Sequence, residues 1–332
     1  MSDVVFRHAA AGEERAVIDF INQNFDMRLP LINRPEFYRH YYAGRDGVPQ
    51  FVVAEQDGRY LSAAGYIRAD AAGRDVWVSV WVAAKGHNGV GLELMNALPQ
   101  LTRAEVVACN NIRPKTCAFY RFLGWQAERL PHYYRLASKA EYSLAVLHRA
   151  DILPVRRDLG LEKVETVDEL FALGMPPTPH TPRKDTWYMR RRYFHYPHFQ
   201  YDVWAARENG RLLAYAVTRT VSAQDTGCVP VVRLVDFVGE DAVLPRIGAA
   251  LDAILHREKA EYMDCYNAGV PAAVWRAAGF VERLPDDEQI IPNYLTPPLH
   301  ENTEYYYFTN KPENFVMFKA DGDQDRPNLP AE

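Results

Sequence analysis

A glycine-rich segment, KGHNGVG (85–91), follows the β-prone run VWVSVWVAA (76–84) and precedes the helical pattern LELMNALPQL (92–101). The first backbone N–H groups of a helix have no partner within it, and the helix dipole adds partial positive charge there. Glycines let the backbone approach a phosphate closely and adopt a positive φ. Lys85 and His87 can add charge. The segment therefore predicts a phosphate-binding turn, with an ordinary strand-to-helix turn as the alternative.

Two other nucleotide-binding motifs do not fit this segment. A P-loop has the pattern GxxxxGK[ST], and neither Lys-Ser nor Lys-Thr follows these glycines. A dinucleotide-binding fingerprint is GxGxxG at the start of a βαβ unit, with an acidic residue about 20 positions further on. Here the GxG lies deep in the domain, after several strands with an antiparallel pattern. Both motifs are therefore excluded.

One phrase of the sequence occurs twice. CAFYRFLGWQAERLP (117–131) and AAVWRAAGFVERLP (272–285) share two aromatic positions, an arginine, a glycine and the ending Glu-Arg-Leu-Pro. Tyr120 and Trp275 hold the same place in the two copies, 155 positions apart. A repeat of this period can reveal a duplicated fold, in which case the rest of the chain should also be similar at this offset.

Two further echoes occur in the same order along the chain. FYRHYY (37–42) resembles RYFHYP (192–197), again at an offset of 155. QFVVAEQDGRYLSAAGYI (50–67) parallels YDVWAARENGRLLAYAVT (201–218), and each is a β-prone run, a glycine-containing turn and a second β-prone run. This pattern predicts a hairpin in both copies. Three echoes in one order favour a duplication.

We therefore predict two related domains, 1–145 and 146–332, the second starting near DILPVRRDLGLEKV (151–164). Each is expected to be a mixed α/β (α+β) domain with a central, mostly antiparallel sheet flanked by helices. Gly124 and Gly279 stand where a helix should stop. The other elements expected in the first domain are a strand at 4–8, a helix after Gly12 with Ala16, Val17, Phe20 and Ile21 on one face, the strand EVVACNN (105–111), the helix KTCAFYRFLG (115–124), and a last strand pair that begins at Trp125 and includes HYYRLA (132–137).

Composition excludes several classes of protein. The chain has 332 residues, of which 48% are hydrophobic and 24% charged, the balance of an ordinary globular protein with two domains. Its net charge of −5 provides no basic field for nucleic acid. No apolar run approaches the ~20 residues that span a bilayer, and the N-terminus lacks a signal-peptide pattern. The four cysteines have no CxxC spacing, so we expect reduced, mostly buried thiols in a cytoplasmic protein.

The order of motifs resembles the GNAT (Gcn5-related N-acetyltransferase) superfamily. The resemblance rests on a strand followed by GHNGVG and a helix, a second strand ending in Asn110 and Asn111, and the phrase AFYRFLGW. Family members commonly carry R/Q-x-x-G-x-G/A at the loop. This chain departs from that pattern, because Gly86 occupies the Arg/Gln position and the nearest cation, Lys85, is displaced by one residue.

The resemblance implies that acetyl-CoA or a longer acyl-CoA binds as the acyl donor, without a metal. The pantetheine arm would lie between the strands around 78–84 and 105–111, and a backbone N–H near Val80 or Val82 would polarise the developing oxyanion. Tyr120 occupies the family position of the general acid that protonates the leaving thiolate, with a core aromatic as the alternative role. The residues implied in binding the donor are Val80, Val82, Lys85, Gly86, His87, Asn88, Gly89, Val90, Gly91 and Asn110.

The second copy lacks the glycine-rich loop and the tyrosine of the first. At the position of the loop it has VGEDAVLPRIGAAL (238–251), without a GxG and with two carboxylates, Glu240 and Asp241. Carboxylates at a helix start satisfy the same N–H donors that a phosphate would use. Trp275 has no proton to give to a thiolate at neutral pH. We therefore predict a degenerate second domain that keeps the fold and does not bind the donor.

The C-terminal segment DGDQDRPN (321–328) combines three carboxylates with one arginine. A solvated acidic tail is one alternative, and a calcium loop is excluded because its Gly and Glu positions are absent. The ending and the two-domain layout resemble N-acyltransferases of surface-polysaccharide synthesis that act on nucleotide-linked amino sugars. This resemblance implies that Asp321, Asp323 or Glu304, or else water, accepts the amine proton, and that Tyr38, His40, Glu304, Tyr305 and Arg326 contact the acceptor. His40 recurs as His195 in the second copy, which favours a structural role.

The leading hypothesis is a CoA-dependent transfer of an acyl group to a primary amine, with a nucleotide-linked (dTDP or UDP) amino sugar as the acceptor. A tandem enzyme acting on another small amine, or a Fem-like aminoacyl transferase, is the second. The tRNA required by the latter would need a basic groove, and RKDTWYMRRRYF (183–194) is the one basic cluster. The third is a protein that binds acyl-CoA or a nucleotide sugar without reaction. The expected partners are small molecules, not nucleic acid or membrane, and a monomer and a dimer both remain open.

Overall fold

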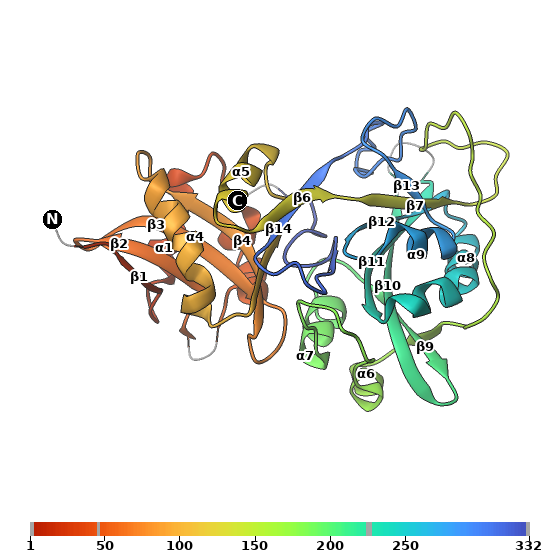
Figure 1. Cartoon of the computed structure of the whole chain (residues 1–332), viewed down its shortest axis with the longest axis horizontal. Helices are drawn as coiled ribbons and strands as arrows, with labels where there is room; N and C mark the ends of the chain where they lie inside the picture. Colours follow the sequence, from red (N-terminus) through yellow and green to blue (C-terminus); the bar gives the residue numbers. More distant parts are fainter. Residues whose placement is uncertain (1–2, 45–46, 224–227, 330–332) are drawn as a thin grey trace.

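The computed structural model describes residues 3–44, 47–223 and 228–329. Among these residues the strands form two mixed sheets, and helices flank both sheets (Figure 1). This architecture confirms the predicted fold class. The elements up to residue 130 are β1 (Val5–His8), α1 (Glu14–Asn24), α2 (Pro30–Asn33), α3 (Pro35–Tyr41), β2 (Phe51–Gln56), β3 (Arg59–Arg68), β4 (Asp75–Ala83), α4 (Asn88–Thr102), β5 (Val106–Asn110), a 3-10 turn (Pro114–Thr116), α5 (Cys117–Phe122) and β6 (Gln126–Leu130).

The rest of the described chain supplies the second sheet and one strand of the first. Its elements are β7 (His132–Leu136), β8 (Glu162–Val164), α6 (Val167–Leu173), α7 (Thr186–Met189), a π-helical turn η3 (Arg190–Phe194), β9 (Asp202–Glu208), β10 (Arg211–Ser222), β11 (Pro230–Gly239), a 3-10 helix η4 (Asp241–Ile247), α8 (Gly248–Arg257), β12 (Tyr262–Ala268), α9 (Ala272–Ala277), β13 (Val281–Arg283), β14 (Tyr305–Thr309) and β15 (Met317–Phe318).

The two sheets exchange strands. The first sheet has the order β1-β2-β3-β4-β5-β14-β6, and the second β13-β7-β12-β11-β10-β9-β8. The expected pairing of the strand after Trp125 with HYYRLA is therefore wrong. β6 stays in the first sheet, and β7, separated from it by Pro131 alone, continues into the second (Figure 1). β14 returns to fill the place beside β5, so a boundary at residue 145 does not separate the strands of the two sheets.

The repeat seen in the sequence brings equivalent residues together. The hydroxyl of Tyr41 donates a hydrogen bond to the hydroxyl of Tyr196 at 3.2 Å, and these residues are 155 positions apart. His40 packs edge-on against both tyrosines. The two helix ends are also equivalent, because Gly124 and Gly279 have φ values of +80° and +90°. Their left-handed backbone confirms the predicted helix stops.

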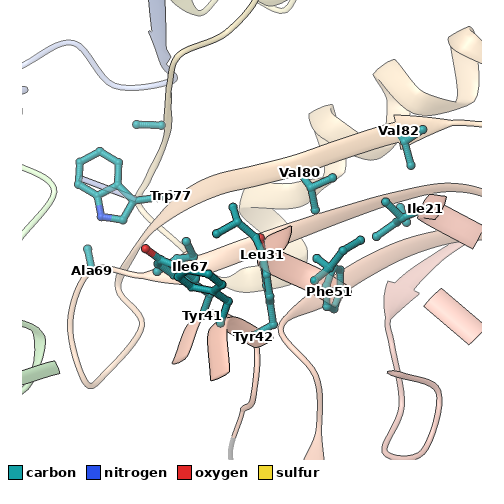
Figure 2. Packing of buried hydrophobic residues seen from close by; sticks show 14 of the residues in the cluster. Ile21, Leu31, Tyr41, Tyr42, Phe51, Ile67, Ala69, Trp77, Val80 and Val82 are labelled. Atoms are coloured by element: carbon teal, nitrogen blue, oxygen red, sulfur yellow. The ribbon is translucent and has the colours of Figure 1, made fainter. Parts of the chain in front are cut away.

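Helices cover the first sheet on both faces. Successive apolar side chains of its strands point to opposite faces, so each face has a core of its own. Val17, Phe20 and Ile21 of α1 are buried, spaced as one helical face. Ala16, expected on that face, is exposed. The α1 side of the sheet is packed by Phe51, Val53, Ala63, Trp77, Val80 and Val82, shown in part in Figure 2, and the α4 and α5 side by Val52, Ala54, Ala64, Val76, Val78, Leu94, Leu98 and Tyr120.

Candidate active site

A cleft opens where β4 and β5 separate. The two strands are parallel partners from Asp75–Val106 to Trp77–Ala108, and their pairing ends there. β4 also carries one extra residue opposite β3, between the pairs Tyr66–Val78 and Ala64–Trp81. Such a bulge leaves a residue outside the ladder and re-aims its neighbours. Trp77 and Val80 consequently pack in the same core on one side of the sheet, although alternation without a bulge would place them on opposite sides.

The cleft contains a cavity of about 610 Å³. Its size falls within the range of ordinary ligand pockets. The lining comes from α1 and the chain after it, β4, the start of α4, β5, α5 and the C-terminal segment. The lining residues are Asn24, Phe25, Asp26, Leu29, Leu31, Val78, Ser79, Val80, Trp81, Val82, Ala83, Asn88, Gly89, Leu92, Cys109, Asn110, Asn111, Ile112, Arg113, Thr116, Phe119, Tyr120, Asp323, Gln324 and Arg326.

The N-terminus of α4 reaches this cavity without a side-chain cap. His87 is the N-cap residue and its side chain makes no capping hydrogen bond, while Asn88 and Gly89 line the cavity. A Cβ at Gly89 would meet nothing within 4 Å, and Gly86 has a φ of +87°. Helix N–H groups with no protein partner and open space before them fit a phosphate group. Lys85 is exposed at this turn, outside the lining.

Gly91 has a packing role at the same helix. A Cβ there would lie 2.9 Å from Cβ of Ala83, closer than real Cβ atoms approach, and 3.4 Å from the ring of Trp81. The missing side chain therefore lets α4 lie directly on the end of β4. This contact sets the distance between the helix start and the cleft. Val90 is half-buried against the same core.

Tyr120 lies on α5 with its ring held between aromatic neighbours. The ring stacks on Phe308 of β14 at 4.0 Å between centroids and on Trp125 at 6.3 Å. Only 4% of the residue is exposed. Burial raises the pKa of the Tyr120 phenol well above its ordinary value. The group therefore keeps its proton at neutral and moderately alkaline pH, as a proton donor requires.

Asp323 reaches the same cavity from the C-terminal segment. Its Oδ2 accepts hydrogen bonds from Ser79 Oγ and from Arg326 Nη1, both at 2.7 Å. Its Oδ1 accepts one from Gln324 Nε2 at 2.8 Å. Ser79 lies at the bulge of β4 and also contacts the hydroxyl of Tyr42 at 2.5 Å. The structure thus brings a carboxylate to the bulge, beside the wall that holds Tyr120.

Asp321 and Asn110 have other partners. Asp321 is fully buried, 2.7 Å from Lys184 Nζ, and it does not line the cavity. Its place among buried residues excludes the solvated tail that the composition allowed. Asn110 lines the cavity, but its amide donates to the carbonyl oxygens of Phe318 and Lys319 at 3.2 and 3.4 Å. Both residues therefore hold the C-terminal segment.

The residues predicted to contact an acceptor lie apart from the cavity, with the exception of Arg326. Tyr38 is a half-buried residue of α3 that packs on Tyr42, and His40 lies against Tyr41 and Tyr196. Burial lowers the pKa of His40 to about 2. Glu304 forms ion pairs with Arg129 and Arg283 at 2.6 and 2.5 Å, and the Tyr305 hydroxyl accepts a hydrogen bond from Asn293. These contacts occupy the groups that were expected to bind a sugar or a base.

Several lining residues were not expected from the sequence. Ser79 could have been noticed as the one polar residue in VWVSVWVAA, and Arg113 follows the predicted strand end at Asn110 and Asn111. Asn24 is the last residue of α1 and Asp26 stands just after the helix, and nothing in their local sequence marks them. Their role depends on the fold bringing the end of α1 over the cleft.

The second half has no equivalent helix start. After β11 the chain forms the 3-10 helix η4 before α8 begins at Gly248, and Asp241 lies 3.1 Å from His180 Nε2. Trp275 donates its indole N–H to Asn267 Oδ1 at 3.0 Å and is fully buried. Among the described residues, no helix is long and apolar enough to cross a bilayer, and no three His, Cys, Asp or Glu side chains are arranged to hold a metal ion.

The two mixed sheets with their flanking helices and splayed strands form a tandem GNAT-like fold. A GCN5-related N-acetyltransferase from Anabaena variabilis has the same fold, with a TM-score of 0.54 and 13% identity over 92% of this chain and 72% of that chain. At this identity the likeness shows the fold alone. No family model and no curated protein matches the chain.

Two further solved structures are similar at lower scores. One is a conserved protein from Enterococcus faecalis described as a probable N-acyltransferase, with a TM-score of 0.49 and 10% identity over 93% of this chain and 72% of that chain. The other is a tandem GNAT protein from the clavulanic acid biosynthesis pathway, with a TM-score of 0.42 and 16% identity over 92% of this chain and 98% of that chain.

Proposed function

We propose that this chain is a CoA-dependent N-acyltransferase that moves an acyl group from acyl-CoA to a primary amine. The observation that carries the proposal is one cavity lined by the uncapped start of α4, the bulge of β4, Tyr120 and Asp323. The helix start would bind the donor's phosphates, and the separated strands would accept its pantetheine arm. An N–H of the bulged strand would stabilise the negative charge that develops on the thioester oxygen.

The two titratable side chains would divide the proton transfers. Asp323 accepts a proton from the attacking amine, whose nitrogen forms the new bond to the acyl carbon. Tyr120 donates its proton to the sulfur as the carbon–sulfur bond breaks, so that an amide and a free thiol leave the site. The proton taken up by Asp323 then returns to Tyr120 through solvent, and the protein is unchanged after one turnover.

We propose a nucleotide-linked amino sugar as the acceptor. Support comes from the polar side chains that line the cavity, where Arg113 and Arg326 can meet phosphate oxygens and Asn111 and Gln324 can bind hydroxyl groups. Phe25 adds an aromatic face beside Arg113. Another small amine would use the same site, and a panel of acceptors distinguishes the two.

The basic cluster at 183–194 gives no support to a tRNA-dependent reaction. Arg183 is bound to the buried carboxylate of Asp75 at 2.8 Å, Arg191 donates to the carbonyl of His40, and Arg192 is buried against the C-terminal segment. These arginines are engaged between the two halves of the chain, so they do not form an exposed groove.

The proposal is tested by combining acetyl-CoA and longer acyl-CoA donors with a panel of amines. The panel contains dTDP- and UDP-linked amino sugars, free amino sugars and simple diamines, and free thiol release is the readout. We expect amine-dependent thiol release, fastest with a nucleotide-linked acceptor. Faster release with a simple amine would overturn the acceptor assignment. Tight CoA binding with no transfer to any amine would contradict the assignment as an enzyme and indicate a binding protein.

A further inference from the structure

The cleft of the second half is filled by the chain's own C-terminal segment. β11 and β12 pair in parallel only at Val232–Met263 and Arg233–Asp264, as β4 and β5 do in the first half. Beyond that point β15 pairs with β12, through Asn267–Phe318 and Ala268–Met317. The backbone N–H of Ala320 donates to the carbonyl of Val235 on β11 at 3.2 Å. The space that is a cavity in the first half is therefore occupied here by protein.

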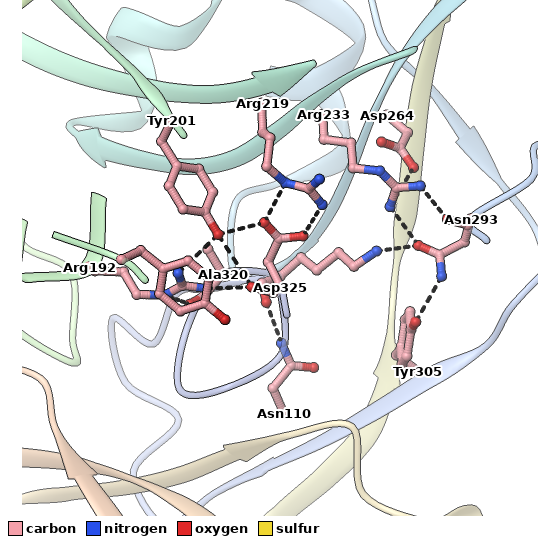
Figure 3. A network of polar contacts seen from close by, with 12 residues as sticks. Asn110, Arg192, Tyr201, Arg219, Arg233, Asp264, Asn293, Tyr305, Ala320 and Asp325 are labelled. Carbon is pink, nitrogen blue, oxygen red and sulfur yellow. Dashed lines mark hydrogen bonds and ion pairs between the residues drawn. The ribbon is translucent and has the colours of Figure 1, made fainter. Parts of the chain in front are cut away.

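The same segment is held by charged side chains of the second half. Asp325 is 2% exposed, and Arg219 of β10 binds both of its carboxylate oxygens, at 2.6 and 2.9 Å. The hydroxyl of Tyr201 donates to Asp325 Oδ2 at 2.8 Å. Arg192 donates to the carbonyl oxygens of Ala320 and Asp325 at 2.9 and 3.0 Å (Figure 3). A two-pronged arginine–carboxylate contact fixes orientation as well as distance.

The candidate base, Asp323, lies between two residues whose carboxylates are bound by cations of the second half. Asp321, two residues before Asp323, is bound by Lys184 at 2.7 Å, and Asp325, two residues after it, is bound by Arg219. Gly322 has a φ of +67°, and a Cβ there would lie 3.3 Å from Trp77 of β4. The chain thus turns against β4 between the attachments. Because both neighbours point into the second half, the carboxylate of Asp323 is directed to Ser79 in the first.

We propose that the second half is a dock for the C-terminal segment, with Arg219 and Asp325 as positioning residues that hold the Asp323 carboxylate at the acyl-transfer site. The inference rests on the proposed function, because it assigns Asp323 a part in the reaction. It explains why a half without a donor site is coupled to the active cleft. In the second half, the C-terminal segment that carries Asp323 occupies the space where a donor's pantetheine arm would otherwise bind.

The positioning role predicts a specific kinetic pattern. A displacement of about 1 Å at a reacting group can lower a rate by roughly 10²-fold. Arg219→Gln removes the two-pronged contact, and we expect kcat to fall roughly 10- to 100-fold while the Kd of CoA stays within about twofold. Tyr201→Phe keeps the ring but removes the hydroxyl that donates to Asp325 Oδ2 and accepts from Arg192 Nη1, and it should lower kcat by a smaller factor. Arg246→Gln is the matched control, since Arg246 pairs with Asp158 and Glu208 on the exposed surface of the same half.

The decisive experiment is a double-mutant comparison with Asp323→Asn. If Arg219 acts through Asp323, Arg219→Gln should lower kcat strongly in the wild-type background and by less than about twofold in the Asp323→Asn background. Hydrogen exchange of the segment around Asp323 should become faster in Arg219→Gln and stay unchanged in Arg246→Gln. Equal losses of kcat in both backgrounds, or unchanged exchange, would overturn the inference.

The outcomes separate this inference from the proposed function. Wild-type protein that transfers no acyl group to any amine removes the proposed function itself. If the wild-type protein transfers acyl groups and the Arg219→Gln and Tyr201→Phe variants have a normal kcat, only the docking role is contradicted. Should Arg219→Gln lose its folded circular dichroism spectrum, the milder Tyr201→Phe variant in the two Asp323 backgrounds decides the question.

Discussion

Ser79 Oγ donates a hydrogen bond to Asp323 Oδ2 at 2.7 Å, although 244 positions of the sequence separate the two residues. Ser79 lies at the bulge of β4, where the acyl carbon of a bound thioester would be placed. The contact therefore joins the C-terminal segment to the point of the cleft where we propose that the acyl group is transferred. Because Tyr42 supports Ser79 from the core side at 2.5 Å, the serine hydroxyl has little freedom to turn away.

Replacement of Asp323 by Asn should lower turnover with little effect on donor binding. The amide keeps the shape of the carboxylate but cannot accept a proton, and loss of a general base typically costs 10²- to 10⁴-fold. We expect a fall of roughly 10²-fold in kcat, measured with the best donor and acceptor pair. Asp158→Asn, on the surface of the second half, is the control. A kcat within twofold of wild type would show that water, not Asp323, accepts the proton.

Replacement of Tyr120 by Phe should separate binding from chemistry. The phenylalanine ring keeps the stacking on Phe308, so the Kd of CoA should change little while kcat falls roughly 10²-fold. Since burial raises the pKa of the Tyr120 phenol, the acid form persists as pH rises, and wild-type kcat should not decline up to about pH 10. Tyr215→Phe is the matched control. A wild-type kcat that falls with an apparent pKa below 9, absent from the variant, would contradict the raised value.

Local pattern was sufficient to predict the hairpins, the α4 turn and both helix-stop glycines, because each depends on residues close in sequence. The exchange of β7 and β14 could not be predicted in this way. The sequence HYYRL has the pattern of any strand, including one that pairs with the strand just before it. Which sheet it joins depends on strands that are distant in the sequence.

The burial of the C-terminal segment was hidden for a related reason. A solvated tail remained an alternative for Asp321 and Asp325 because the partners of these residues, Lys184 and Arg219, lie more than a hundred positions earlier in the sequence. A buried charge requires an opposite charge, but the sequence does not show which cation is brought to it. The prediction that Asp323 and Arg326 lie at the site came from the resemblance of the C-terminal segment to a family of enzymes, not from the composition of that segment.

The two glycines at the start of α4 should respond differently to alanine. A Cβ at Gly91 would stand 2.9 Å from that of Ala83, so Gly91→Ala must move α4 or β4, and overpacking of this kind costs about 1–3 kcal/mol. A Cβ at Gly89 meets nothing within 4 Å. Gly89→Ala should therefore unfold at the same denaturant concentration as wild type, while its methyl group, at the cavity wall, weakens CoA binding. Equal stability of the two variants would contradict the packing role of Gly91.

Lys319 should make the stability of the protein depend on pH in the neutral to alkaline range. Burial lowers the pKa of its amine from the ordinary 10.5 to about 7, with the positive charge of Arg233 acting in the same direction and the carboxylate of Asp264 against it. Between these two values the unfolded chain binds the proton and the folded chain does not. The free energy of unfolding should therefore rise with pH, by up to about 1.4 kcal/mol per pH unit for one group.

A Lys319→Met variant isolates this contribution, since methionine fills a similar volume without a titrating amine. The ammonium of Lys319 lies against Asn293 and the rings of Tyr266 and Tyr305, and among the described residues no carboxylate forms an ion pair with it. Urea unfolding at intervals from about pH 6 to pH 9 should show the wild type gaining stability relative to the variant above pH 7, with no relative change below it. Two stability curves that stay parallel over the whole range would mean that the lysine keeps its proton in the folded protein, and that the surrounding dipoles compensate for its burial.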